Sequence, residues 1–120
     1  MGAVGIIAEY NPIHTGHARQ IAETRAALGE DTAVVAVMSG NWVQAGRPAC
    51  ADKWLRTQLA LRGGVDLVLE LPTVWAVSSA ETFAWGGVSL LRATGVVTDL
   101  SFGSECGDVS ALEAVADCLD

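Results

Sequence analysis

The sequence predicts a three-layer α/β fold in which helices cover both faces of a parallel β-sheet. Short β-branched runs alternate with segments of helical period along the chain, as in consecutive βα units. The strand candidates are almost entirely apolar, as expected for strands that are covered on both faces. The chain has 120 residues, of which 51% are hydrophobic. We therefore expect residues 1–120 to form one domain with right-handed crossovers.

The first βα unit begins with Ala3–Ala8, an apolar run without a basic leader, which indicates a buried strand rather than a signal peptide. A segment of helical period follows and is expected to end at Gly29, because glycine commonly terminates a helix. One face of this helix is expected to carry Ala18, Ile21, Ala22, Arg25 and Leu28.

The second unit pairs a strand at Ala33–Met38 with a helix from about Ala51 to Arg62. This helix places Leu55 and Leu59 on one apolar stripe, and the two glycines at 63 and 64 are expected to end it.

The third strand is predicted at Leu67–Leu71, and Pro72 is expected to end it because proline has no N–H to donate. The following helix begins with the capping-box spacing of Ser78 and Glu81. Its apolar face is expected to carry Val77, Ala80, Phe83, Ala84, Val88 and Leu91.

The fourth unit has a strand at Val97–Phe102 and a helix that begins at Ser110 with the same capping-box spacing. The sequence ends at Asp120, which is expected to be the end of this helix. Doubly wound nucleotide-binding domains commonly have five or more strands, so we expect the fold to be truncated here.

Composition argues against several classes of protein. No apolar run is long enough to cross a membrane. Cys50, Cys106 and Cys118 show no C-x-x-C spacing, so we expect neither a disulfide framework nor a zinc site, and we expect a cytoplasmic protein. The net charge is −7, with 7 basic against 14 acidic residues, which does not suit a surface that holds a large RNA by itself. A nucleotide needs only a few N–H groups and cations.

The loop after the first strand carries the most specific chemistry, and it reads Glu9-Tyr-Asn-Pro-Ile-His14-Thr-Gly-His17. In an open parallel sheet, ligands bind at the carboxyl ends of the strands. Gly16 allows close approach of the backbone to a ligand, and the helix start offers N–H groups and the positive end of the helix dipole. His14 and His17 can both donate hydrogen bonds to phosphate oxygens, as transfer at an α-phosphate requires.

Two other interpretations of this histidine pair stay open. Both residues could simply belong to the start of a helix. They could also bind a metal ion, but no third His or acidic residue stands at ligand spacing, so we expect no metal site.

The loop and its surroundings resemble a known enzyme family. The H-x-G-H pattern after a first strand is similar to that of the HIGH-type nucleotidyltransferases. Nearly the whole chain resembles the bacterial tRNA(Met) cytidine acetate ligase family. The segments that carry this resemblance, in order, are Gly5–His17, Val37–Gln44, Gly46–Ala49, Asp52–Trp54, Gly64–Pro72 and Ser101–Glu105.

That resemblance implies a Rossmann-like three-layer nucleotidyltransferase fold and a two-step reaction. Acetate would attack the α-phosphate of ATP to give acetyl-adenylate, and the acetyl group would then pass to N4 of the wobble cytidine of elongator tRNA(Met). The implied substrate is ATP, accompanied by Mg²⁺, and His14 and His17 are the implied catalytic residues. The implied ATP-binding residues are Ile7, Ala8, Glu9, Tyr10, Asn11, Pro12, Ile13, His14, Thr15, Gly16, His17 and Gly103.

Members of that family are several times longer than this chain. Their remaining ATP contacts and their tRNA-binding region lie beyond the position equivalent to Asp120. The resemblance therefore implies that tRNA binds through a region that this chain does not contain, which agrees with its shortage of positive charge.

Two polar residues near the second strand, Asn41 and Gln44, are candidates for substrate contacts. The alternative is a structural turn in which Trp42 acts as an aromatic plug. Two more candidates, Ser104 and Glu105, follow the fourth strand. Glu105 could contact ribose hydroxyls or Mg²⁺, or it could be an ordinary loop acid.

Three basic residues, Arg47, Lys53 and Arg56, surround the start of the second helix. They could meet a phosphate or the acetate carboxylate, and Lys53 is a candidate substrate contact. The alternative is a solvated helix face, as is usual for charged residues. The acids that flank the third strand, Asp66 and Glu70, are weaker candidates for a catalytic carboxylate.

Two other functions remain open. The chain could belong to a different HIGH-type adenylyltransferase that makes a dinucleotide-like cofactor from a phosphorylated acceptor. It could also be a nucleotide-binding fragment without catalytic competence, since part of its pocket would be absent. Trp54, Trp75 and Trp85 are expected in the core or on a surface that further chain covers.

Overall fold

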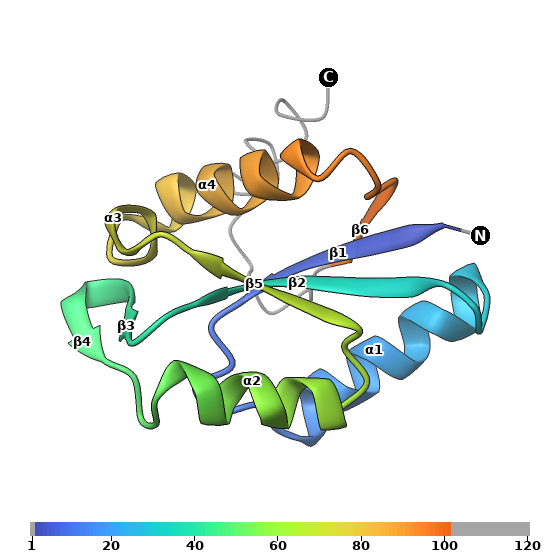
Figure 1. The fold of residues 1–120 in the computed structure, drawn as a ribbon, viewed down its shortest axis with the longest axis horizontal. Coiled ribbons are helices and arrows are strands. Elements are labelled where there is room, and N and C mark those ends of the chain that lie inside the picture. The colour runs from blue at the N-terminus through green and yellow to red at the C-terminus, as the bar shows by residue number, and fades with distance from the viewer. Residues whose placement is uncertain (1, 102–120) are drawn as a thin grey trace.

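The computed structural model describes residues 2–101, and it confirms the predicted α/β class. Four strands form a parallel sheet in the order β5-β2-β1-β6 (Figure 1). Their bounds are β1 Ala3–Ala8, β2 Ala33–Ser39, β5 Leu67–Leu71 and β6 Asp99–Ser101. The predicted fourth helix lies outside the described residues, as do Gly103, Ser104 and Glu105.

Helices cover both faces of this sheet and complete three layers. In Figure 1, α1 (Thr15–Leu28) and α2 (Lys53–Arg62) lie on one face, whereas α3 (Thr73–Ala76) and α4 (Ala80–Ala93) lie on the other. Alternate residues of the strands face opposite layers. The α1/α2 layer buries Val4, Ile6, Ile21, Val34, Ala36, Met38 and Ala60, and the α3/α4 layer buries Val35, Val37, Leu71, Ala76 and Leu91.

The sheet reverses its strand order beside β1. The chain passes from β1 to β2 and then to β5 on one side, whereas β6 returns to pair in parallel with the other side of β1. The first and fourth strands of the sequence are therefore neighbours in the sheet. Ligands of open α/β sheets bind at such a switch point, beyond the carboxyl ends of the strands.

Several predicted boundaries and faces were wrong. The second helix starts at Lys53, because Asp52 caps it by accepting from the N–H of Leu55 at 2.8 Å. Its buried face holds Arg56 and Ala60, whereas Leu55 is 47% exposed. In the first helix, Ile21 is buried but Ala22 and Leu28 of the expected face are exposed. α2 thus turns Arg56 and Ala60 inward, where a leucine stripe was expected.

The third predicted helix divides into two. Pro72 begins the short α3, Val77 ends it, and α4 starts one residue later than predicted, with Ser79 rather than Ser78 as its cap. The apolar face of α4 is largely confirmed, since Val88 and Leu91 are buried. β5 is an edge strand of the described sheet, and its Leu67 and Glu70 are exposed, so the expectation of cover on both faces fails there.

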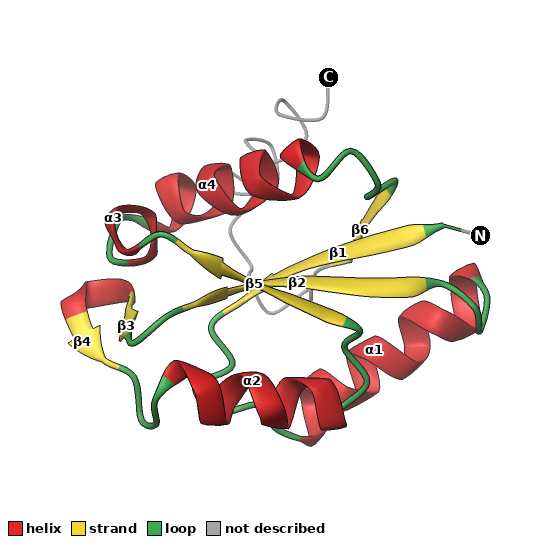
Figure 2. Cartoon of the chain, in the orientation of Figure 1, coloured by secondary structure: helices red, strands yellow, loops and turns green. Residues whose placement is uncertain are grey.

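A small hairpin after β2 was not predicted as regular structure. β3 (Trp42–Val43) and β4 (Arg47–Pro48) pair antiparallel around a 3₁₀ turn, η1 (Gln44–Gly46). Figure 2 shows this hairpin beyond the carboxyl end of β2, on the side of the molecule where α3 begins. Strands of two residues are too short to give a periodic signal.

The close approach of α4 to β1 depends on Gly87. A Cβ at this position would lie 2.7–2.9 Å from three carbons of the Ile7 side chain. Replacing Gly87 with alanine is expected to lower the free energy of unfolding by about 1–2 kcal/mol, because overpacking outweighs the gain in helix propensity. Urea unfolding measures the change, with Ser89→Ala on the exposed face of α4 as the control. A Gly87→Ala chain as stable as this control would contradict the packing argument.

Candidate nucleotide site at the end of β1

The loop that leaves β1 turns sharply before it enters α1. Tyr10 has a φ of 46°, in the left-handed region, and the peptide bond between Asn11 and Pro12 is cis. The side chain of Ile13 packs against the core on the α1/α2 side, close to Gly63 at the end of α2. The loop is therefore fixed to the body of the domain at both ends.

His14 and His17 form a reciprocal capping box at the start of α1. The Nδ1 atom of His14 accepts from the N–H of Gly16 at 3.0 Å, and the Nδ1 atom of His17 accepts from the N–H of His14 at 3.1 Å. Imidazoles here fill the role that a hydroxyl and a carboxylate commonly play. The two rings stack with their centroids 3.7 Å apart and their planes at 26°.

This arrangement fixes which ring nitrogens can serve a ligand. A ring nitrogen that accepts a hydrogen bond carries no proton, so each neutral imidazole has its proton on Nε2. Both side chains therefore present Nε2–H as their donor. The helix-start interpretation and the ligand-binding interpretation do not exclude each other, because they use different nitrogens of the same rings.

Gly16 has a different local role from the one expected. A Cβ here would lie 2.8 Å from Cε1 of His14, so glycine makes room for that ring to fold over the helix start. The N–H of Gly16 bonds to His14, and the N–H of His17 bonds to the His14 carbonyl oxygen at 3.0 Å. In this conformation, both of these backbone N–H groups are already bonded within the loop.

Tyr10 packs against the histidine pair through the ring of His17. Its ring meets the ring of His17 edge to face, with the centroids 5.0 Å apart, and the residue is 1% exposed. Its hydroxyl has no hydrogen-bond partner among the described residues. Burial raises the pKa of Tyr10 to about 12, because the phenolate is poorly solvated there.

The pH dependence of stability follows from this shift. Folding favours the protonated phenol, so its contribution is fully present below pH 10.0 and is lost as the pH rises through about 12. Tyr10 is the one tyrosine of the chain, so near-ultraviolet absorbance of the phenolate reports on it alone. We expect a midpoint at about pH 12 in the folded chain. A titration midpoint at pH 10.0 in the folded chain would refute burial of this ring. The Tyr10→Phe variant, which has no phenol, gives the absorbance baseline.

Arg56 joins the loop after β1 to the loop after β2. Its side chain reaches from α2 with 0% exposure and donates to the carbonyl oxygens of Glu9, Tyr10, Ser39 and Gly40. The bonds to Tyr10 and Ser39 measure 3.0 and 2.9 Å. Burial lowers the pKa of Arg56, although a guanidinium stays protonated in proteins. Neither sequence interpretation of Arg56, a ligand contact or a solvated face, is correct.

The hairpin after β2 is tied to the same loop. The N–H of Gln44 donates to Oε2 of Glu9 at 2.7 Å, and the N–H of Cys50 donates to Oδ1 of Asn11 at 2.7 Å. Oδ1 of Asn41 accepts from the N–H of Lys53 at 2.9 Å. Glu9, Asn11 and Asn41 thus each accept a backbone N–H from the segment between β2 and α2, and substrate contacts by Asn41 and Gln44 stay a prediction.

The remaining candidate residues lie on β1, at the starts of α1 and α2, and on or next to β5. Thr15 opens α1, and Ile7 and Ala8 end β1. Lys53 forms an ion pair with Glu70 at 2.9 Å. Asp66 has a structural role, since its Oδ2 accepts from Arg25 at 2.7 Å and from the N–H of Val34 at 2.8 Å.

Sequence reasoning missed Arg56 as the organising residue of the site. One signal could have revealed it, because Arg56 and Ala60 are four residues apart and share a helical face. A small residue on that face permits close packing against the sheet. The stripe of Leu55 and Leu59, one residue earlier, led to the wrong prediction of the buried face.

Neither a metal cluster nor a membrane helix is found in the described part of the chain. No group of three or more His, Cys, Asp or Glu side chains among residues 2–101 could hold a metal ion. No helix within the same residues is long and apolar enough to cross a membrane.

Comparison with known proteins gives consistent matches. A crystal structure of Thermotoga maritima TmcAL bound with alpha-thio ATP matches at a TM-score of 0.83 and 50% identity, covering 99% of this chain and 29% of that chain. The tRNA(Met) cytidine acetate ligase of Thermoanaerobacter sp. (strain X514) is 52% identical over 119 residues, which are 99% of this chain and 29% of that protein. The protein of the same name from Clostridium novyi (strain NT) is 48% identical, and the match covers 100% of this chain and 30% of that protein.

The chain therefore spans about 29% of the length of the relatives it matches. The family model described as HIGH Nucleotidyl Transferase matches residues 1–120. Since that match extends over the whole chain, and the histidine pair stands at the start of α1 beside the switch point, this chain belongs to the HIGH nucleotidyl transferase family.

Proposed function

We propose that this chain is the ATP-binding part of a tRNA(Met) cytidine acetate ligase that acts in the cytoplasm. It would activate acetate with ATP and transfer the acetyl group to N4 of the wobble cytidine of elongator tRNA(Met). The observation that carries the proposal is the stacked pair of His14 and His17, whose Nδ1 atoms are occupied by the helix cap and whose donors are at Nε2.

In the first step, an acetate oxygen attacks the α-phosphorus of ATP, and the bond from that phosphorus to the pyrophosphate oxygen breaks. Negative charge builds on the phosphoryl oxygens and on the leaving pyrophosphate. The Nε2–H groups of His14 and His17 and the positive end of α1 are suited to stabilise this charge, because they are already in place before the reaction. No covalent intermediate with the protein is needed.

In the second step, N4 of cytidine attacks the acetyl carbon of acetyl-adenylate. The bond from this carbon to the AMP oxygen breaks, AMP leaves, and N4 loses a proton. The protein's net charge of −7 does not favour a long RNA surface on this chain. We therefore propose that most tRNA contacts come from the further length that the relatives possess.

Support for ATP as the nucleotide comes from the Thermotoga maritima relative, which was crystallised with alpha-thio ATP. The name of the curated relatives supports the acetate and tRNA assignments. No group of three or more His, Cys, Asp or Glu side chains among residues 2–101 could hold a metal ion by itself. Mg²⁺ at nucleotide sites is held mainly by the phosphates with one or two carboxylates, so we propose that it enters the site with ATP.

The test is acetate-dependent exchange of pyrophosphate into ATP. It is made with a family-length protein, meaning a protein of the relatives' length that carries this sequence. Exchange that requires acetate is the expected result. Exchange that instead requires nicotinamide mononucleotide or phosphopantetheine would assign the chain to a cofactor-forming adenylyltransferase and overturn the proposal. Calorimetric titration of ATP into the 120-residue chain tests separately whether this part alone binds the nucleotide.

A further inference from the structure

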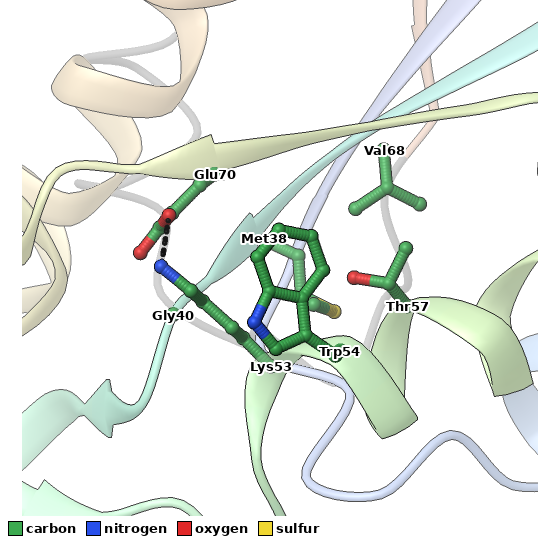
Figure 3. A pocket seen from close by; sticks show the side chains of 7 residues that line it. All are labelled: Met38, Gly40, Lys53, Trp54, Thr57, Val68 and Glu70. Carbon is green, nitrogen blue, oxygen red and sulfur yellow. Dashed lines mark hydrogen bonds and ion pairs between the residues drawn. The ribbon is translucent and has the colours of Figure 1, made fainter.

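A second site lies on the α2 face of the sheet, over the carboxyl ends of β2 and β5. It is a pocket of about 230 Å³ (Figure 3). Met38 and Val68 supply its apolar floor, and α2 supplies one wall with Lys53, Trp54 and Thr57. Figure 3 shows the indole of Trp54 between the Lys53–Glu70 pair on one side and Thr57 and Val68 on the other.

The polar end of this pocket is fixed by three separate contacts. Nζ of Lys53 lies 2.9 Å from Oε1 of Glu70 and 5.5 Å from the centroid of the Trp54 ring. The Glu70 carboxylate rests against Gly40, where an added Cβ would lie 2.1 Å from Oε2. Residues from α2, β5 and the end of β2 therefore combine to hold one carboxylate and one ammonium side by side.

The apolar part of the pocket has the form of a stacking platform. Trp54 is 71% exposed, although an indole is the largest apolar side chain. Stacking of a base on an aromatic side chain contributes about 1–3 kcal/mol and is available to every base. The ion pair of Lys53 and Glu70 then offers polar contacts to the edge of the stacked base.

The Glu70 carboxylate accepts hydrogen bonds and the Lys53 ammonium beside it donates them. Together they match a base whose edge presents an amino donor next to a ring-nitrogen acceptor. The pairing edges of cytosine and adenine both have this order, with an exocyclic amino group next to a ring-nitrogen acceptor, whereas uracil presents an acceptor at O4 next to a donor at N3. Of the two bases that match, the proposed function selects cytosine. Glu70 accepts hydrogen bonds, and Lys53 has three donors, of which one is directed at Glu70. We propose that this pocket binds the acceptor cytosine, with the ring stacked on Trp54, N4 donating to Glu70 and N3 accepting from Lys53.

This inference rests on the proposed function, which supplies an acceptor amine on cytidine. Arg56 joins the pocket to the nucleotide loop, because it stands on α2 between Lys53 and Thr57. Its guanidinium donates to the carbonyl oxygen of Gly40, in the pocket lining, and to that of Tyr10, in the loop after β1. The Arg56 clamp, meaning this guanidinium and the four carbonyl oxygens that it bonds, thus holds both the backbone at Gly40 beside the pocket and the loop that carries the histidines.

The first experiment separates acetyl transfer from acetate activation in the family-length protein. Trp54→Ala and Glu70→Gln are each expected to lower kcat/KM for acetyl transfer to tRNA by about tenfold or more. Acetate-dependent pyrophosphate exchange should stay within about twofold of wild type, since these side chains line the acceptor pocket and lie outside the histidine loop. Trp54→Phe, which keeps an aromatic face, should retain most of the transfer activity. Gln58→Ala, exposed on α2 outside the pocket, is the matched control.

Each outcome of this experiment has one meaning. Transfer at the wild-type rate in both variants would overturn the pocket assignment while leaving the proposed function intact. Loss of exchange in parallel with transfer would also overturn it, because the pocket would then serve the nucleotide. Absence of acetate-dependent exchange in the wild-type protein would instead refute the proposed function.

The second experiment uses the 120-residue chain and needs no activity. CMP, UMP and AMP are titrated in turn while the indole N–H resonance of Trp54 is followed by NMR. We expect CMP to shift this resonance in a saturable manner and UMP to bind at least about tenfold more weakly, the effect of one mismatched polar contact. Equal response to CMP and UMP, no response to CMP, or tighter binding of AMP would overturn the assignment.

Discussion

Replacing His17 with alanine in the family-length protein is expected to slow acetate-dependent pyrophosphate exchange by about a hundredfold or more. The change removes the Nε2–H group, and one preorganised donor to a developing anion contributes on the order of 3 kcal/mol. It also removes the Nδ1 acceptor that bonds the N–H of His14 and the ring on which His14 stacks. Alanine alone therefore does not separate catalysis from helix capping.

Two further variants at the same position make that separation. In His17→Asn, the amide oxygen stands where Nδ1 stood, so the cap to His14 can persist while the Nε2–H donor is lost. In His17→Gln, the longer side chain returns an N–H donor near the position of Nε2. We expect the asparagine variant to be as slow as the alanine variant and the glutamine variant to recover part of the rate.

Stability provides the control for this series. Loss of the cap should cost about 1 kcal/mol in His17→Ala and less in His17→Asn, as measured by thermal unfolding. If His17→Asn exchanged as fast as wild type, His17 would be a capping residue without a role in phosphate stabilisation. The proposed mechanism would then lose one of its two side-chain donors.

Replacing Arg56 with methionine is expected to lower the free energy of unfolding by about 3–5 kcal/mol, because four carbonyl oxygens lose their donor in a site with 0% exposure. At about 4–8 °C per kcal/mol for a small domain, the midpoint of thermal unfolding should fall by at least about 12 °C. Arg56→Lys keeps the charge but offers three donors on one atom, so an intermediate loss is expected.

Arg62→Met, at the exposed last turn of α2, is the matched control and should change stability by less than about 1 kcal/mol. An Arg56→Met chain as stable as this control would mean that the four carbonyls find other partners. The clamp would then be dispensable to the fold.

The sequence predicted the layers and the start of the first helix because both follow from strong local signals. β1 and β5 match their predicted bounds, since each is a short apolar run between polar turns. The H-x-G-H pattern marks the start of α1 because its two histidines cap this helix.

The network behind the site could not be predicted in the same way. Arg56 bonds to backbone carbonyls, which every residue possesses, so nothing at Glu9 or Gly40 marks them as partners. The pairing of Lys53 with Glu70 joins residues 17 positions apart and depends on how α2 lies over β5. Such contacts arise from the tertiary arrangement, which periodicity does not encode.

The Arg56 clamp also bears on how the domain moves. A single planar group holds carbonyls from the end of β1 and from the end of β2, so neither segment can separate from α2 without exposing the guanidinium and the other segment's oxygens. The two segments should therefore open together, as one cooperative unit with one free energy of opening. Any adjustment of the site to its ligands then falls to parts of the chain that Arg56 does not hold, such as the turn between β3 and β4.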